Sequence, residues 1–280
     1  ISQVSTTEEA AAVLRSTVID LVICMPGNAD NDAFDVARDI KGKFPNIHCV
    51  VLTPFSHGIT KRMQNEDLSI FDYVFCWLGN TNLILSIIKL IEDKMNLEHD
   101  IQEAGVQMIL LVEDSIRFYS SILPNLYNYI LEQSKNFSQE ALNRHAATMR
   151  MRGRPKVVLA RTYEEAQKLY DKYSDNTLGV ISDARFPLKS AAKAFGNEVM
   201  PEEKPKHRTD TFGREKCPDA GLQLFRYIRK NDPFVPLIIE SSESENRAKA
   251  EAEGFRFVDK NSKKMSVDLR RLMEEHMGFG

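Results

Sequence analysis

The sequence predicts an α/β protein made of two doubly wound domains on parallel sheets. Strand-like and helix-like segments alternate along all 280 residues, which is typical of βα units. The two halves of the chain also repeat the same pattern, and the length suits two domains that each bury a full core.

The first half begins with a helix and continues as strand, helix, strand, strand and long helix. The corresponding segments are TTEEAAAVLRS (6–16), IDLVICMP (19–26), DAFDVARDIKGKFP (32–45), IHCVVLTP (47–54), FDYVFCWL (71–78) and NTNLILSIIKLIEDKMNLEHDIQEAG (80–105). Thr6 and Glu9 form a capping box for the first helix. Asn80 or Thr81 is suited to cap the long helix, and Gly105 to end it.

The second half contains five strands that alternate with five helices. Its strands are MILLVEDS (108–115), VVLART (157–162), LGVISD (178–183), VPLIIESS (235–242) and FRFVDK (255–260). The helices between and after them are a long stretch from Ser115 to about Arg150, TYEEAQKLYDKY (162–173), GLQLFRYIRK (221–230), ENRAKAEAEG (245–254) and SVDLRRLMEEHMG (266–278). Such regular alternation predicts a five-stranded parallel sheet with helices on both faces.

Four pairs of segments carry the internal repeat. TTEEA matches TYEEA, FDVARDIK matches LQLFRYIR, VVLTP matches IIESS, and FDYVFC matches FRFVDK. We therefore expect a first domain at 1–96, a helical linker at 97–106 and a second domain at 107–280. The second domain has an extended first helix and an insertion at about 188–218. The first copy lacks its opening strand and helix, so we expect the chain to be a fragment.

Composition excludes several classes of protein. Hydrophobic residues make up 42% and charged residues 28%, which fits a folded globular protein. A net charge of −3 argues against nucleic acid as the main partner. The four cysteines form no CxxC pair, and no apolar run approaches the ~20 residues of a membrane span. We expect reduced thiols, no membrane partner and a cytoplasmic location.

A basic stretch closes the extended helix of the second half. It contains Arg144, His145, Arg150, Arg152 and Arg154. Two readings stay open: a solvated helix end whose cations favour its C-terminus, or a docking surface for an acidic partner.

Polar residues stand at the carboxyl ends of the second-half strands. Glu113 and Asp114 end the first of them, and Asp183, Ser241 and Lys260 end the third, fourth and fifth. These ends meet in one crevice in a doubly wound sheet. Three crowded carboxylates need a cation, and oxygen ligands suit Mg²⁺. A carboxylate nucleophile, Mg²⁺, a hydroxyl and a lysine are what an aspartyl phosphate requires.

The segments LLVEDS, VISDARFP, IIESS and FVDK, in this order, resemble the receiver domain of two-component response regulators, a flavodoxin-like fold. The likeness covers roughly residues 107–277. It implies that Asp183 is the phosphoacceptor, with Lys260 beside it and Ser241 and Phe257 as conformational switches. The Mg²⁺ ligands that it implies are Glu113, Asp114, Asp183 and the backbone carbonyl of Arg185.

The first half resembles the same family without its chemistry. Cys24 or Met25 occupies the position of the acceptor acid, Cys76 replaces the lysine, and only the hydroxyl of Thr53 is kept. We therefore expect a degenerate pseudo-receiver that serves in packing or dimerisation. In the second half, Glu240 stands where the family has an apolar residue. Its side chain either enters the site and discourages phosphorylation or points away from it.

The resemblance implies a regulatory module rather than an enzyme. Its phosphoryl source would be a histidine kinase, a phosphotransfer protein or a small phosphodonor, and its target downstream catalytic domains or a second copy of itself. More narrowly, the second half is similar to the N-terminal receiver-like region of phosphoenolpyruvate synthase/pyruvate phosphate dikinase-like proteins of Bacteroidetes. This resemblance implies that the chain is a regulatory fragment of a larger phosphotransferase.

Two other functions are alternatives to a phosphorylated regulator. One is a scaffold that works without phosphorylation. The other, a haloacid-dehalogenase-like phosphatase, is disfavoured because it needs a second acid where Arg185 stands.

Overall fold

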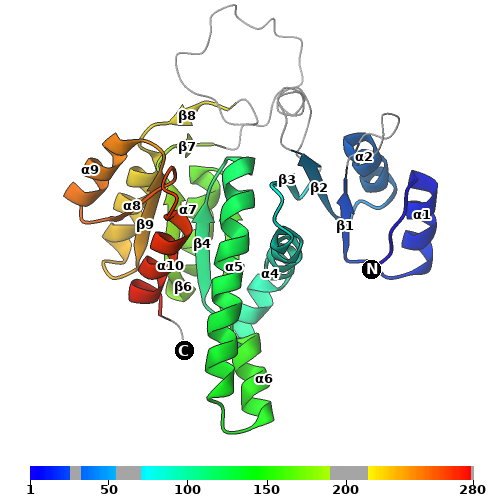
Figure 1. The fold of residues 1–280 in the computed structure, drawn as a ribbon, viewed down its shortest axis with the longest axis horizontal. Helices are drawn as coiled ribbons and strands as arrows, with labels where there is room; N and C mark the ends of the chain where they lie inside the picture. Colours follow the sequence, from blue (N-terminus) through cyan, green and yellow to red (C-terminus); the bar gives the residue numbers. More distant parts are fainter. Residues whose placement is uncertain (26–32, 55–70, 190–213, 279–280) are drawn as a thin grey trace, which may run out of the picture. The chain divides into compact units, whose positions relative to one another are not determined.

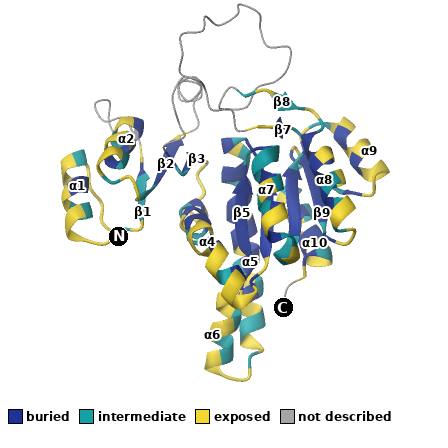
Figure 2. Ribbon diagram, turned by 180° about the vertical axis from the view of Figure 1, so that it is seen from behind, coloured by how far each residue is buried: buried dark blue, intermediate teal, exposed yellow. Residues whose placement is uncertain are grey.

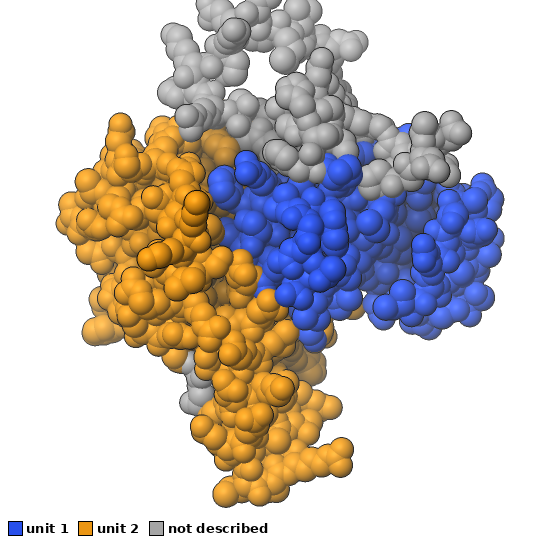
Figure 3. Space-filling model, in the orientation of Figure 1, with its two compact units in different colours: residues 1–91, 116–124 blue, residues 92–115, 125–280 orange. Residues whose placement is uncertain are grey.

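Helices and parallel strands alternate through the computed structural model, which describes residues 1–25, 33–54, 71–189 and 214–278 (Figure 1). The predicted α/β class with parallel sheets is confirmed. The chain divides into two compact units, residues 1–91 with 116–124 and residues 92–115 with 125–280 (Figure 3). No helix in the described part is long and apolar enough to cross a membrane. The four cysteines are not joined by disulfides in this structure.

Unit 1 contains a three-stranded parallel sheet in the order β1-β2-β3. Its elements are α1 (Thr7–Ser16), β1 (Leu21–Cys24), α2 (Ala33–Lys43), β2 (His48–Pro54), β3 (Tyr73–Trp77) and the first part of α4 (Asn82–Ala104). The Thr6 hydroxyl accepts a hydrogen bond from the Glu9 amide, as the capping box predicts. Three consecutive parallel strands are common to many α/β folds. The interpretation of the first half as a degenerate copy of the second-half domain therefore stays a prediction.

Unit 2 is built on a five-stranded parallel sheet in the order β10-β9-β6-β4-β5, which is the flavodoxin-like order. The strands of this sheet are β4 (Met108–Val112), β5 (Lys156–Ala160), β6 (Thr177–Asp183), β9 (Leu237–Ser241) and β10 (Arg256–Asp259). The helices are the part of α4 from Glu92 onward, the part of α5 (Ile116–Gln139) from Asn125 onward, α6 (Arg144–Arg152), α7 (Tyr163–Tyr173), α8 (Ala220–Asn231), α9 (Ser244–Ala252) and α10 (Met265–His276), with a 3₁₀ turn at Ser174–Asn176. The short strands β7 (Phe186–Pro187) and β8 (Lys216–Cys217) pair antiparallel.

The sheet of unit 2 is buried on both faces. Every residue of β4, β5 and β9 is buried, as expected for apolar parallel strands that helices cover (Figure 2). The part of α5 from Asn125 onward lies beside α10, where Asn125 bonds Ser266 at 3.0 Å and Glu132 pairs with Arg270 at 3.0 Å. Helices α7, α8 and α9 cover the face of the sheet opposite to α5 and α10, and they pack into one apolar cluster with the strands.

The long helix predicted from Ser115 to about Arg150 is instead two helices. The break lies at residues 140–143, and the Asn143 side chain caps α6 by accepting a hydrogen bond from the Ala146 amide at 2.8 Å. Arg150 donates to the Phe137 carbonyl at 2.7 Å and lies 4.1 Å from the centre of the Phe137 ring. Helix α6 therefore folds back along α5 as a hairpin (Figures 1 and 2).

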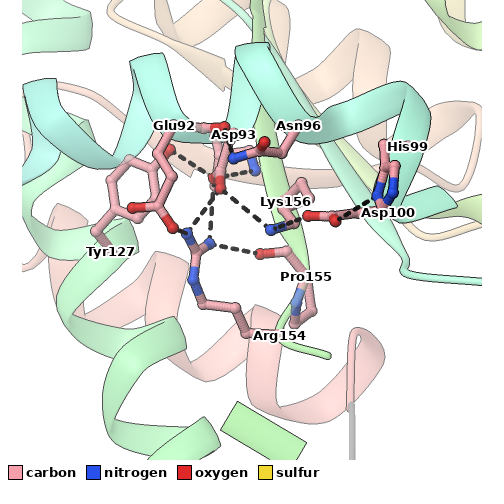
Figure 4. A network of polar contacts seen from close by, with 10 residues as sticks. Glu92, Asp93, Asn96, His99, Asp100, Tyr127, Arg154, Pro155 and Lys156 are labelled. Carbon is pink, nitrogen blue, oxygen red and sulfur yellow. Dashed lines mark hydrogen bonds and ion pairs between the residues drawn. The ribbon is translucent and has the colours of Figure 1, made fainter. Parts of the chain in front are cut away.

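A buried polar network joins α4 to the start of β5 (Figure 4). The Asp93 side chain is fully buried. Its carboxylate accepts hydrogen bonds from Arg154 at 2.7 and 3.2 Å, from the Tyr127 hydroxyl at 2.9 Å and from the Val157 amide at 2.9 Å. Arg154 is only 5% exposed, so this member of the basic stretch belongs neither to a solvated helix end nor to a docking surface.

A second ion pair continues the network. Lys156 Nζ lies 2.6 Å from Asp100 Oδ2 and 3.9 Å from Asp93 Oδ1. Burial alone would raise the pKa of Asp100, but the Lys156 ammonium lowers it below its ordinary value. Two acids of α4 thus neutralise two cations of the β5 segment, which fixes α4 against the sheet edge.

Candidate functional site

The strand ends of unit 2 bring together the acids that the sequence singled out. Glu113 and Asp114 follow β4 directly, and Asp183 is the last residue of β6. One carboxylate oxygen from each of these three residues lies within 4.8 Å of the other two. Because β4 and β6 are neighbours in the sheet, the parallel register alone produces this convergence.

Strand register also decides which side chains share a face. Val112 is paired with Ser182, so the next residues, Glu113 and Asp183, lie on one face of the sheet. Asp183 is paired with Glu240 on β9, which places the Glu240 side chain on that same face. The side chain of Glu240 therefore points toward the acids, which settles the alternative left open by the sequence.

Lys260 is the central cation of the site. Its side chain is 1% exposed, and its ammonium forms ion pairs with Glu113 and with Asp183 Oδ1, the latter at 2.9 Å. Burial alone would lower the pKa of Lys260, but the carboxylates of Asp183 and Glu113 raise it above its ordinary value. Lys260 therefore stays charged and holds both acids in place.

Asp114 faces a different cation. Lys216 is the first residue of β8, and its Nζ lies 2.6 Å from Asp114 Oδ2. Apart from this ion pair, neither oxygen of the fully buried Asp114 side chain has a hydrogen-bond donor among the described residues. Burial raises the pKa of Asp114 to about 7, although the Lys216 ammonium acts in the opposite direction.

The donor set fits a hard divalent cation. Three carboxylates converge, and Asp114 leaves buried oxygen lone pairs without hydrogen bonds. Oxygen donors of this kind are the ligands that Mg²⁺ prefers. Asp183, with a side chain 13% exposed, is the most accessible of the three acids.

The predicted switch residues point away from the acids. The Ser241 hydroxyl accepts hydrogen bonds from the Asn246 side chain at 2.9 Å and from the Glu243 amide at 3.1 Å. The Phe257 ring is half-buried, and the Arg247 guanidinium lies 4.7 Å from its centre. The Arg185 side chain pairs with Glu243 at 2.7 Å.

Glu240 is a buried acid without a partner. Both carboxylate oxygens are buried and have no hydrogen bond within the described part of the chain. Burial raises the pKa of Glu240 to about 8; the Lys260 ammonium acts in the opposite direction, and the nearby charges of Glu113 and Asp183 add to the rise. At neutral pH Glu240 therefore carries a proton for most of the time and adds little negative charge to the site.

The insertion predicted at 188–218 lies largely outside the described residues, which resume at residue 214. Its described C-terminal end supplies Lys216, a residue that sequence reasoning did not identify as part of the site. A lysine in a polar segment has no local pattern that would indicate its partner. Only the pairing of Pro187 with Lys216, four residues beyond Asp183, brings it to the acids.

Gly221 positions the backbone of Asp183. A Cβ at this helical glycine would lie 2.3 Å from the Asp183 carbonyl oxygen, which cannot rotate away. We expect Gly221→Ala to lower the free energy of unfolding by about 1–3 kcal/mol, because overpacking against backbone outweighs the better helix propensity of alanine. The urea midpoint would measure the loss.

Gly179→Ala is the matched control for this substitution. The added Cβ would meet the end of the flexible Met277 side chain, which can move. An equal loss from both variants would contradict the role of close backbone packing at Gly221.

Comparison with known proteins gives only weak structural likeness. No protein-family model matches the chain, and no curated protein does. A solved structure described as a response regulator receiver domain protein from Clostridium thermocellum shares 18% sequence identity, with 61% of this chain and 94% of that chain covered and a TM-score of 0.34. This TM-score is too low to establish a common fold.

Proposed function

We propose that unit 2 is a regulatory receiver module that accepts a phosphoryl group on Asp183. The observation that carries the proposal is the contact of Lys260 with Asp183 and Glu113 at the carboxyl edge of a flavodoxin-ordered sheet. A partly exposed carboxylate, a buried lysine and two further acids supply the groups that acyl phosphate formation needs.

In the proposed step, an Asp183 oxygen bonds to the phosphorus of the donor while the bond from phosphorus to the donor's leaving atom breaks. The electron pair of that bond leaves with the donor. Lys260 orients the carboxylate and offers its ammonium to a phosphoryl oxygen. Glu113, Asp114 and Asp183, with the Arg185 carbonyl as a further ligand, would hold Mg²⁺, which when bound neutralises charge on the phosphoryl group.

The proposed switch follows from the contacts of Ser241 and Phe257. If the Ser241 hydroxyl turns to donate to the phosphoryl group, it gives up its hydrogen bond from Asn246 on α9. If Phe257 turns inward, it loses the cation–π contact with Arg247, also on α9. Both changes act on α9, so we propose that this helix and β9 form the surface that changes.

Incubation of the full chain with acetyl phosphate and Mg²⁺, followed by intact mass spectrometry, tests the phosphoacceptor. We expect a mass increase of one phosphoryl group that Asp183→Asn abolishes. Asp175→Asn, the same substitution at the exposed residue near the opposite end of β6, should leave the modification unchanged. An unmodified wild type, or modification that persists in Asp183→Asn, would overturn the assignment.

We propose that unit 1 is a degenerate copy of the receiver, that the protein works in the cytoplasm, and that phosphoryl groups come from a histidine kinase, a phosphotransfer protein or a small phosphodonor. The target would be an attached or partner protein, with a phosphoenolpyruvate-synthase-like enzyme as the candidate. The chain itself is proposed to be regulatory rather than an enzyme.

A scaffold that works without phosphorylation is the second candidate. The ion pair between Asp114 and Lys216 favours it, because this contact already neutralises an acid that the metal would use. A stable dimer in light scattering, together with no Mg²⁺-dependent modification, would favour the scaffold over the receiver.

A further inference from the structure

The site carries two built-in cations opposite its three acids. Lys260 contacts Glu113 and Asp183, and Lys216 contacts Asp114. The aspartyl phosphate chemistry needs only the first of these lysines. The second lies on the oxygen set that a metal ion would use.

The position of Lys216 is set by backbone pairing. Strand β7 begins three residues after Asp183, and its Pro187 pairs with Lys216 in the antiparallel β7–β8 ribbon. The Lys216 side chain is 15% exposed and its partner is fully buried, so the ammonium is held inside the site rather than on its rim.

The ammonium and a divalent cation compete for the same oxygen. An ammonium 2.6 Å from Asp114 Oδ2 occupies the space through which a metal ion must approach that oxygen. An ammonium and a metal ion that both contact Asp114 would also repel each other strongly in this buried site. Lys216 must therefore move away before Asp114 can bind a metal ion with its full affinity.

We propose that Lys216 is an internal competitor of the divalent metal, so that metal binding is coupled to release of the β7–β8 ribbon from the acidic cluster. This inference rests on the proposed receiver function, because it requires Asp114 to be a metal ligand. It makes the described end of the insertion a regulator of metal affinity.

Titration of the full chain with Mn²⁺, followed by the EPR signal of free Mn²⁺, tests the competition. Lys216→Gln should bind Mn²⁺ roughly tenfold to a hundredfold more tightly than wild type, the effect of removing one charge-assisted contact. Lys168→Gln removes the same charge from an exposed pair with Glu164 and should leave the affinity unchanged.

The outcomes separate the two claims. Equal Mn²⁺ affinity of wild type and Lys216→Gln would overturn the competition and leave the receiver proposal intact. No Mn²⁺ binding by either protein would overturn the metal site, and the inference with it. Tighter Mn²⁺ binding by Lys216→Gln, with unchanged binding by Lys168→Gln, supports both the metal site and the competition.

A second measurement uses the unaltered chain. If Mn²⁺ displaces Lys216, amide hydrogen exchange in residues 214–218 should become faster when Mn²⁺ is added to wild type. Unchanged or slower exchange there, at saturating Mn²⁺, would contradict release of the ribbon.

Discussion

Replacing Asp93 with alanine is expected to lower the free energy of unfolding by about 3–5 kcal/mol, because the buried Arg154 guanidinium would lose its main counter-ion. The variant also removes the acceptor for the Tyr127 hydroxyl and the Val157 amide. Urea unfolding followed by circular dichroism would measure the loss. The sequence did not indicate this cost, since Asp93 and Arg154 lie 61 positions apart.

Glu92→Ala provides the control for Asp93→Ala. Glu92 also lies near Arg154, at 3.8 Å, but its side chain is 40% exposed, so we expect a loss below about 1 kcal/mol. Removal of Arg154 together with Asp93, as Arg154→Met, should recover part of the loss because no unpaired charge is left. Similar losses from Glu92→Ala and Asp93→Ala would contradict burial as the cause.

Features that depend on local pattern were predictable from the sequence. The five strands of unit 2 are apolar runs that end on polar residues, and their regular alternation with helices predicts a parallel sheet. The convergence of Glu113, Asp114 and Asp183 could be predicted from this arrangement, because parallel strands place their carboxyl ends at one edge of the sheet. Sequence reasoning therefore located the acids without knowing any contact between them.

Features that depend on tertiary pairing were not predictable. Arg154 stands in a basic stretch that is typical of a solvated helix end, yet Asp93 draws it into the interior. Lys216 reaches Asp114 only through the β7–β8 ribbon. Apolar periodicity also did not predict the helix break before Asn143, because the chain is helical on both sides of it, as α5 before the break and α6 after it.

Glu240 shows what the strand register adds to a sequence pattern. Alternation along β9 allowed either face, and the pairing with Asp183 decides between them. The burial that follows raises the pKa of Glu240 from 4.5 to about 8, so the carboxyl is more acidic in the unfolded chain than in the folded one. Folding therefore takes up a proton between these two values.

The free energy of unfolding should fall as pH rises from about 5 to 8, because the Glu240 contribution is complete below the unfolded pKa and is lost toward the folded one. The slope approaches about 1.4 kcal/mol per pH unit, which gives roughly 3–4 kcal/mol across this range. Glu240→Gln cannot titrate and should lose this component of the pH dependence. Urea titrations of both proteins at several pH values, with EDTA present, would measure the difference, and parallel profiles would contradict the protonated state of Glu240.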